Sequence, residues 1–196
     1  IKTLFWRNSV LNFNSPESLL KSLDEKPKKE WLRRINECED EKVLKYLLKN
    51  NKEIILNLNS NNLRLLWESC QIPDFVKKTY GHHIEVVTKV FKFLTSKNRK
   101  ISNNYMKQQL SKLDKIDGNV DSISNRIANV RTWSYVSNKS NWVENQDYWI
   151  ERTKYLEDKL SDRLHEELTK SFIDKRASVL ARGLKQDITF DTKIME

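Results

Sequence analysis

The three histidines are the residues of this chain whose type best suits metal binding or proton transfer. His82 and His83 are adjacent, and adjacent positions on a helix point about 100° apart. Glu85 is the only acid close to them in the sequence. His165 opens the stretch HEELT, which resembles the metal-binding pattern HExxH, but Thr169 stands where that pattern needs its second histidine. We therefore expect structural or exposed roles for the histidines.

Four acids stand close together and could in principle hold a cation: Glu37, Glu39, Asp40 and Glu41. They lie at the start of a predicted helix, where acids are stabilised by the helix dipole, so capping is the expected role. The sequence also lacks the glycine-rich patterns GxxxxGK[ST] and GxGxxG and the GxSxG nucleophile motif. We expect no catalytic residues, no metal site and no cofactor bound by this chain.

Positive charge is concentrated in one part of the sequence. Residues 89–115 contain eight lysines and arginines and a single acid, and the whole chain has a net charge of +9. Clustered cations favour phosphate backbones because each neutralised phosphate releases counterions. The alternative is a solvated lysine face without a partner. We predict nucleic-acid contacts from Lys89, Lys92, Lys97, Arg99, Lys100 and Lys107.

Aromatic residues lie in and after this basic segment. Tyr105, Trp133 and Tyr135 could stack on bases, but we expect them to lie in the core. Two cysteines without CxxC spacing indicate a reducing compartment, and we expect a cytoplasmic protein. No apolar run approaches the roughly 18 residues that cross a bilayer, so no membrane partner is expected.

The elements that must position these residues are predicted to be helices. Only three glycines and three prolines occur in 196 residues, and a third of the residues are charged, which describes helices joined by short polar loops. We predict an all-α, multi-helix bundle with two packed helical subdomains, residues 1–97 with an N-terminal arm and residues 98–196 with a long C-terminal helix. The polar connector at 98–104 separates them. Helices are expected near residues 16–23, 28–38, 40–49, 61–71, 82–97, 103–115, 120–136 and 145–184.

The last predicted helix carries an unusual apolar stripe. Leu156, Leu160, Leu164, Leu168 and Phe172 recur every four residues, and each step overshoots a helical turn by about 40°. The stripe therefore cannot form one flat face. We expect this helix either to pack against different neighbours along its length or to break before Gly183.

Several longer phrases are specific enough to indicate a family. They are LFWRN at residues 4–8, LWESCQIPDF at 66–75, RTWSYV at 131–136, EDKLSDRLHE at 157–166 and FIDKR at 172–176. Together they resemble the region after the second RecA-like domain in bacterial relatives of the mitochondrial degradosome RNA helicase, a DExH-type enzyme of superfamily 2. The resemblance covers residues 4–184.

This resemblance implies a non-catalytic helical accessory region that packs on the motor domains of the same polypeptide and helps to enclose single-stranded RNA. ATP and Mg²⁺ would be bound by the parent helicase, a hydrolase, upstream of Ile1. The absence of an initiator methionine or signal-like stretch likewise suggests a piece of a longer protein. A nuclease or another protein is a further candidate partner.

Two other functions remain open from the sequence. The chain could be a protein-docking or structural scaffold module without nucleic-acid contact. In that case apolar surface should be bare at Phe5–Trp6 and at residues 142–149. An independent enzyme has little support, because no catalytic constellation accompanies the helices.

Overall fold

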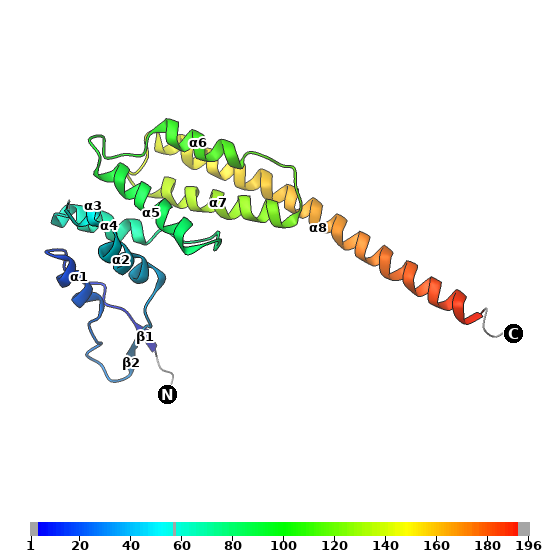
Figure 1. Cartoon of the computed structure of the whole chain (residues 1–196), viewed down its shortest axis with the longest axis horizontal. Helices are drawn as coiled ribbons and strands as arrows, with labels where there is room; N and C mark the ends of the chain where they lie inside the picture. Colours follow the sequence, from blue (N-terminus) through cyan, green and yellow to red (C-terminus); the bar gives the residue numbers. More distant parts are fainter. Residues whose placement is uncertain (1–3, 57, 192–196) are drawn as a thin grey trace.

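The computed structural model describes the backbone of residues 4–56 and 58–191, and the side chains of these ranges as far as residue 183. Within these ranges the chain forms eight helices and one two-stranded sheet, which confirms the all-α expectation (Figure 1). The elements are β1 (Leu4–Trp6), α1 (Pro16–Leu23), β2 (Leu32–Arg34), α2 (Glu39–Asn50), α3 (Lys52–Leu56), α4 (Ser60–Cys70), α5 (Tyr80–Thr95), α6 (Asn103–Leu113), α7 (Val120–Asn138) and α8 (Gln146–Asp191).

Side-chain caps determine where most of these helices begin. Ser15, Asn59, Thr79, Ser102 and Asn119 each accept a hydrogen bond from the backbone N–H three residues later, at the starts of α1, α4, α5, α6 and α7. Such caps satisfy amide groups that lack partners inside the helix. The acids of α2 lie in its first turn, as expected from the helix dipole.

The predicted helix at residues 28–38 is wrong. Residues 32–34 form β2 instead, which pairs in parallel with β1 so that Leu4 faces Leu32 and Trp6 faces Arg34. Along Trp31–Arg34 exposed and half-buried residues alternate, which is the period of a strand. The extended arm supplies this pairing, and the partner strand lies too far away in sequence for local spacing to reveal it.

A buried carboxylate ties the sheet to the helices. Glu41, in the first turn of α2, is only 1% exposed and lies between two guanidinium groups, 3.2 Å from Arg7 and 3.1 Å from Arg34. Arg7 also makes a bidentate contact with Asp40, and Arg34 also pairs with Asp24. These pairs connect the segment after β1, the end of β2, the end of α1 and the start of α2.

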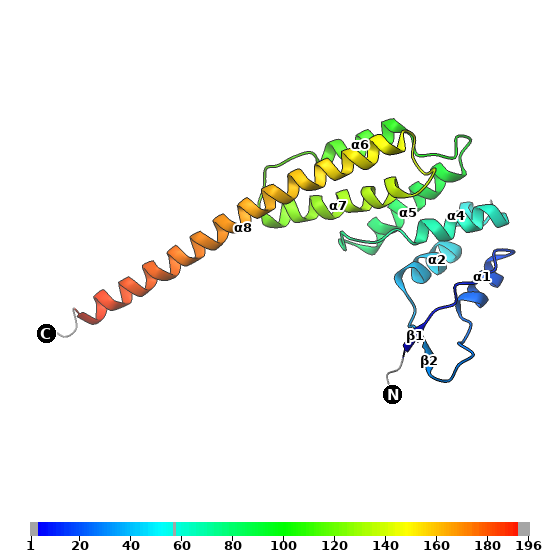
Figure 2. The same cartoon turned by 180° about the vertical axis from the view of Figure 1, so that it is seen from behind.

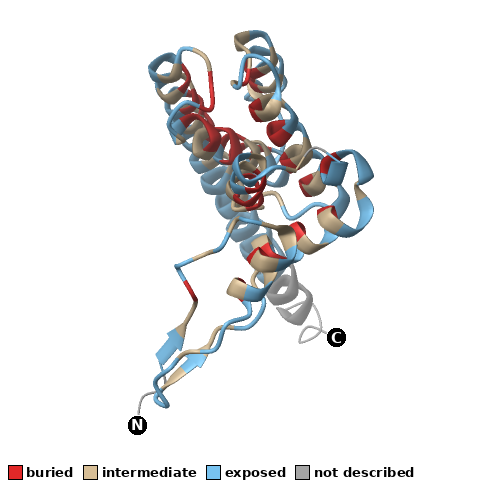
Figure 3. Ribbon diagram, turned by 90° about the vertical axis from the view of Figure 1, so that its left-hand side faces the viewer, coloured by how far each residue is buried: buried red, intermediate tan, exposed pale blue. Residues whose placement is uncertain are grey.

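The second half of the chain is a bundle of α6, α7 and the first part of α8. Leu156 and Leu160 of α8 are fully buried, as are Ile123 and Val130 of α7, and Trp133 of α7 is buried beside them. Figure 3 shows the buried residues on the inner faces of the helices, while the strands are largely exposed or half-buried. The bundle core therefore depends on the pairing of α7 with α8.

The connector between α5 and α6 is held in place. Ile101 is fully buried, its N–H donates to the carbonyl of Trp142 over 2.8 Å, and its carbonyl accepts from the N–H of Glu144 over 3.1 Å. Phe93 of α5 packs on Tyr105 of α6 with ring centroids 4.8 Å apart. One apolar cluster thus continues across the proposed boundary at residue 97, and the division into two subdomains stays a prediction.

Helix α8 does not break before Gly183, contrary to one of the two sequence expectations. It runs continuously from the bundle and projects away from it (Figures 1 and 2). The apolar stripe passes from buried to exposed along it: Leu160 is fully buried, Leu164 is half-buried, and Leu168 and Phe172 are 47% and 59% exposed. The stripe therefore turns around the helix over the same residues at which α8 leaves the bundle.

Removing Arg34 tests the role of the buried Glu41. Arg34→Met deletes a cation that Glu41 and Asp24 share. We expect the free energy of unfolding to fall by about 2–3 kcal/mol, somewhat less than for a fully buried pair because Arg34 is partly exposed. Arg33→Met, at the exposed neighbouring position of β2, is the control. Urea titrations that show equal losses for both variants would contradict this role.

Candidate nucleic-acid interface

The predicted basic residues lie on three consecutive elements. Lys89 and Lys92 are exposed on α5, Lys97, Arg99 and Lys100 lie in the loop at residues 96–102, and Lys107 is exposed on α6. Lys92 pairs with Glu53 of α3 over 2.7 Å, whereas Lys107 lines a groove beside α8. The two lysines thus face different neighbours, and the cluster is not a single row on one helix.

The three cations of the loop at 96–102 lie at one end of the bundle. This loop and the loop at 139–145 are joined by the backbone bonds of Ile101, which bridges in parallel to Val143. Lys139 of the second loop lies over the ring of Tyr135, 5.0 Å from its centroid. Arg99 has a positive φ of 50°. The joined loops therefore gather Lys97, Arg99, Lys100 and Lys139 at the end where α6 and α8 begin.

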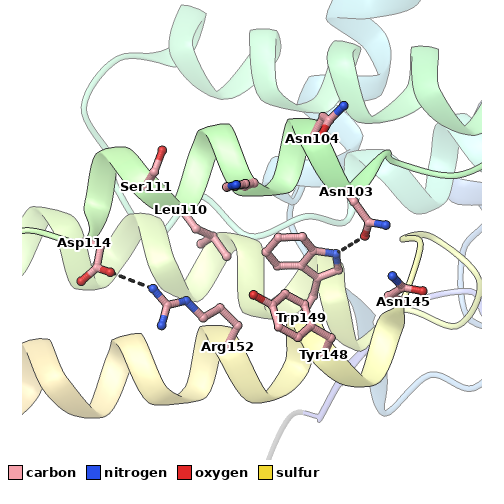
Figure 4. A pocket seen from close by; sticks show the side chains of 10 residues that line it. Asn103, Asn104, Leu110, Ser111, Asp114, Asn145, Tyr148, Trp149 and Arg152 are labelled. Carbon is pink, nitrogen blue, oxygen red and sulfur yellow. Dashed lines mark hydrogen bonds and ion pairs between the residues drawn. The ribbon is translucent and has the colours of Figure 1, made fainter.

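A groove of about 580 Å³ runs between α6 and the start of α8 (Figure 4). Its walls combine amide, cationic and aromatic side chains. The lining residues are Asn103, Asn104, Lys107, Leu110, Ser111, Asp114, Asn145, Tyr148, Trp149 and Arg152. A groove with this mixture offers stacking surface, hydrogen-bond donors and positive charge in one place.

Trp149 forms the fixed part of the groove. It is buried, and its Nε1–H donates to the Oδ1 of Asn103 over 2.8 Å. Asn103 is itself held because its backbone N–H donates to Glu144 over 2.9 Å. The neighbouring Tyr148 is 57% exposed and meets Trp149 edge-on, with centroids 4.8 Å apart. The groove therefore presents one free aromatic ring on a rigid support.

The cations of the groove are partly neutralised by one acid. Asp114 accepts from Arg152 over 2.8 Å and from Lys159 over 2.7 Å. The hydrogen bond from Lys159 is the main reason that the pKa of Asp114 is lowered. Arg152 also lies over the ring of Tyr155, 5.4 Å from its centroid. Tyr148, Arg152 and Tyr155 follow each other at spacings of four and three along α8, which places them along one side of the helix.

The aromatic residues singled out from the sequence lie mostly in the core. Trp133 is buried, and Tyr105 is half-buried between Phe93 and Trp133. Trp142 and Trp149 are also buried. The expectation of bare apolar surface at residues 142–149 is therefore wrong for both tryptophans.

The exposed aromatic residue of the groove, Tyr148, and its neighbour on α8, Tyr155, were missed from the sequence. Tyr148 and Tyr155 are both more than half exposed. Tyr148, Arg152 and Tyr155 fall within an arc of about 60° on α8, and the buried Leu156 and Leu160 lie about 90° away from that arc's centre. Spacing alone could not tell which aromatic side chains face the solvent.

The other chemical candidates have structural surroundings. His83 is buried, and burial lowers its pKa, so it is neutral near pH 7. The ligand atoms of Cys38, Asp40 and Glu41 lie within 4.8 Å of one another, but Arg7 contacts both carboxylates. His165 is exposed, and its backbone carbonyl accepts from Thr169. Burial also raises the pKa of the Cys70 thiol, which makes it a poor nucleophile.

No protein-family profile, curated protein or solved structure gives a significant match to this chain. Among residues 4–56 and 58–191, none of the helices combines the length and the apolar character that spanning a bilayer requires.

Proposed function

We propose that this chain is a non-catalytic accessory region of an ATP-dependent RNA helicase, which contacts single-stranded RNA and packs on the motor domains of the same polypeptide. The groove between α6 and α8 is the observation that carries the RNA contact. It combines the exposed ring of Tyr148 with the cations Lys107 and Arg152. Single-stranded nucleic acids are bound by such combinations because bases stack on aromatic rings while cations meet phosphates.

The loop cations extend the positive surface to the groove. Lys97, Arg99 and Lys100 directly precede the cap of α6, and Lys107 lies one turn into that helix. Because Ile101 and Asn103 are both bonded to the 139–145 loop, the cations and Tyr148 are held at the same end of the bundle. An RNA strand is proposed to lay its phosphates on the loop cations and a base on Tyr148.

The helicase assignment is supported by the sequence phrases, among them RTWSYV at 131–136 and FIDKR at 172–176. In this proposal ATP and Mg²⁺ belong to the parent motor, and this chain supplies neither a nucleotide site nor a catalytic residue. A nuclease or another protein remains a proposed partner of the parent. The free cysteines Cys38 and Cys70 are compatible with a cytoplasmic protein.

A docking function is the second candidate, and a different surface favours it. Leu4 and Phe5 of β1 are 52% and 70% exposed, and Trp31, just before β2, is 49% exposed. Large apolar side chains gathered on a short sheet suit a protein partner. In our proposal this sheet packs on the motor domains. If the groove does not bind RNA, docking is the remaining function of the two.

Charge reversal tests the loop cations. We expect Lys97→Glu, Arg99→Glu and Lys100→Glu together to weaken single-stranded RNA binding by roughly tenfold or more and to reduce the slope of log affinity against log salt by about 2, at about 0.7 per phosphate. Fluorescence anisotropy at several salt concentrations measures both. The control is Lys26→Glu, Lys28→Glu and Lys49→Glu, which changes the net charge equally at exposed positions elsewhere. Equal losses in the two triple variants would exclude a localised site.

Tyr148 tests the stacking contact separately from charge. We expect Tyr148→Ala to weaken RNA binding by about 1–3 kcal/mol, the usual value of one stacked base, without changing the salt slope. Tyr148→Phe keeps the ring and should retain the affinity. Tyr46→Ala, at another exposed tyrosine, is the matched control in the same anisotropy assay. Wild-type affinity for Tyr148→Ala would remove the groove from the proposed path of the RNA.

A further inference from the structure

Beyond the bundle, one side of α8 lines a hollow with residues 119–121 at the start of α7, while the helix itself projects away from the described bundle (Figure 1). We call residues 161–183 the α8 arm. The hydrogen bond from Arg163 to the carbonyl of Ile116, over 3.3 Å, joins α8 to the loop between α6 and α7 near the end of the bundle. The arm then continues as a helix and projects from the bundle (Figure 2). At 1.5 Å per residue it is about 35 Å long.

The arm exposes an apolar face. Its five large apolar side chains, each between 47% and 68% exposed, are Leu168, Phe172, Ile173, Val179 and Leu180. At 100° per residue they fall within an arc of about 140° on the helix. A lone helix in water is only marginally stable, and most helical stability comes from burying such a face. This face therefore needs a partner surface.

The charges of the arm are divided between its two halves. In residues 161–169 the acids Asp162, Glu166 and Glu167 outnumber the single base Arg163, whereas residues 170–183 carry four bases and one acid. The four bases are Lys170, Lys175, Arg176 and Arg182. The first half is thus negative and the second half positive. The charges of the arm are therefore complementary to those of a second arm that runs in the opposite direction.

We propose that two copies of this chain pair through their α8 arms in antiparallel orientation. Antiparallel pairing places the acidic half of each arm against the basic half of the other, whereas parallel pairing would align like charges. If the arms cross at Phe172, the midpoint of the arm, Asp162 of one copy lies level with Arg182 of the other, and both are within about 80° of Phe172 around the helix. The apolar faces then meet around Phe172. This pairing does not depend on RNA binding.

Within one copy, two of these side chains already cover each other. Arg176 lies over the ring of Phe172, 5.2 Å from its centroid, and Glu166 pairs with Arg163 over 2.8 Å. Both pairs are exposed, and exposed pairs contribute little stability. They can therefore exchange for contacts with the second copy at small cost.

Sedimentation of the 196-residue chain tests the pairing. We expect a monomer–dimer equilibrium that moves toward dimer as concentration rises, and we expect Phe172→Glu to raise the dissociation constant by roughly tenfold or more, as for a central contact residue. Val10→Glu replaces an exposed apolar side chain near the N-terminus, far from the α8 arm in the sequence. It should leave the equilibrium unchanged. Circular dichroism should show that both variants keep their helices, because both positions are exposed.

Charge exchange tests the orientation. Asp162→Lys with Glu166→Lys should weaken the dimer, and so should Arg176→Glu with Arg182→Glu, whereas a chain carrying all four substitutions should regain it. In a parallel dimer the two acidic halves would face each other, and so would the two basic halves. Reversing one half in both copies would then replace facing acids by facing bases, or the opposite, and like charges would still meet. A chain that stays monomeric at the highest attainable concentration, a dimer insensitive to Phe172→Glu, or no recovery in the fourfold variant would overturn the proposal. In the first case the face would be left to the motor domains or another protein.

Discussion

Two loops that lie about forty residues apart in the sequence are joined by backbone hydrogen bonds at one end of the bundle. The carbonyl and N–H of Ile101 bond to residues 144 and 142, and Asn103 adds bonds to Glu144 and Trp149. Backbone groups buried without partners are costly, so this junction fixes both loops at once. It sets the position of α6 against α8 and thereby creates the groove. The positions of the loop cations and of the Tyr148 ring depend on this junction.

The groove is balanced electrostatically rather than simply basic. Asp114 engages Arg152 and Lys159, so these side chains are held in fixed directions before any ligand arrives. Lys107 lines the same groove, and the loop residues Lys97 and Arg99 are exposed. In the proposed function the fixed charges orient the strand beside Tyr148, while the loop cations provide most of the salt-dependent attraction. A second group of ion pairs around buried Glu41 holds the N-terminal sheet and has no part in that contact.

Local signals in the sequence predicted most of the helices but not their partners. The caps Ser15 and Ser102 and the spacing of apolar residues placed α1, α2, α4–α7 and the start of α8 within two positions, because these signals act within one or two turns. Residues 28–38 were assigned wrongly to a helix because the strand partner of Leu32 is Leu4, beyond the reach of local patterns. The basic segment was visible in the sequence, whereas Tyr148 and Arg152 were not recognised as groove residues. Whether an aromatic ring faces the core, as Trp149 does, or the solvent depends on tertiary packing.

The central claim is that single-stranded RNA follows the loop cations into the groove between α6 and α8. Photo-crosslinking of the chain to a single-stranded RNA containing 4-thiouridine, followed by identification of the modified peptides, tests it most directly. The account predicts crosslinks within residues 97–107 and 148–155, and their loss when unlabelled RNA competes. Crosslinks confined to the N-terminal sheet and α1, or spread evenly over the surface, would contradict it.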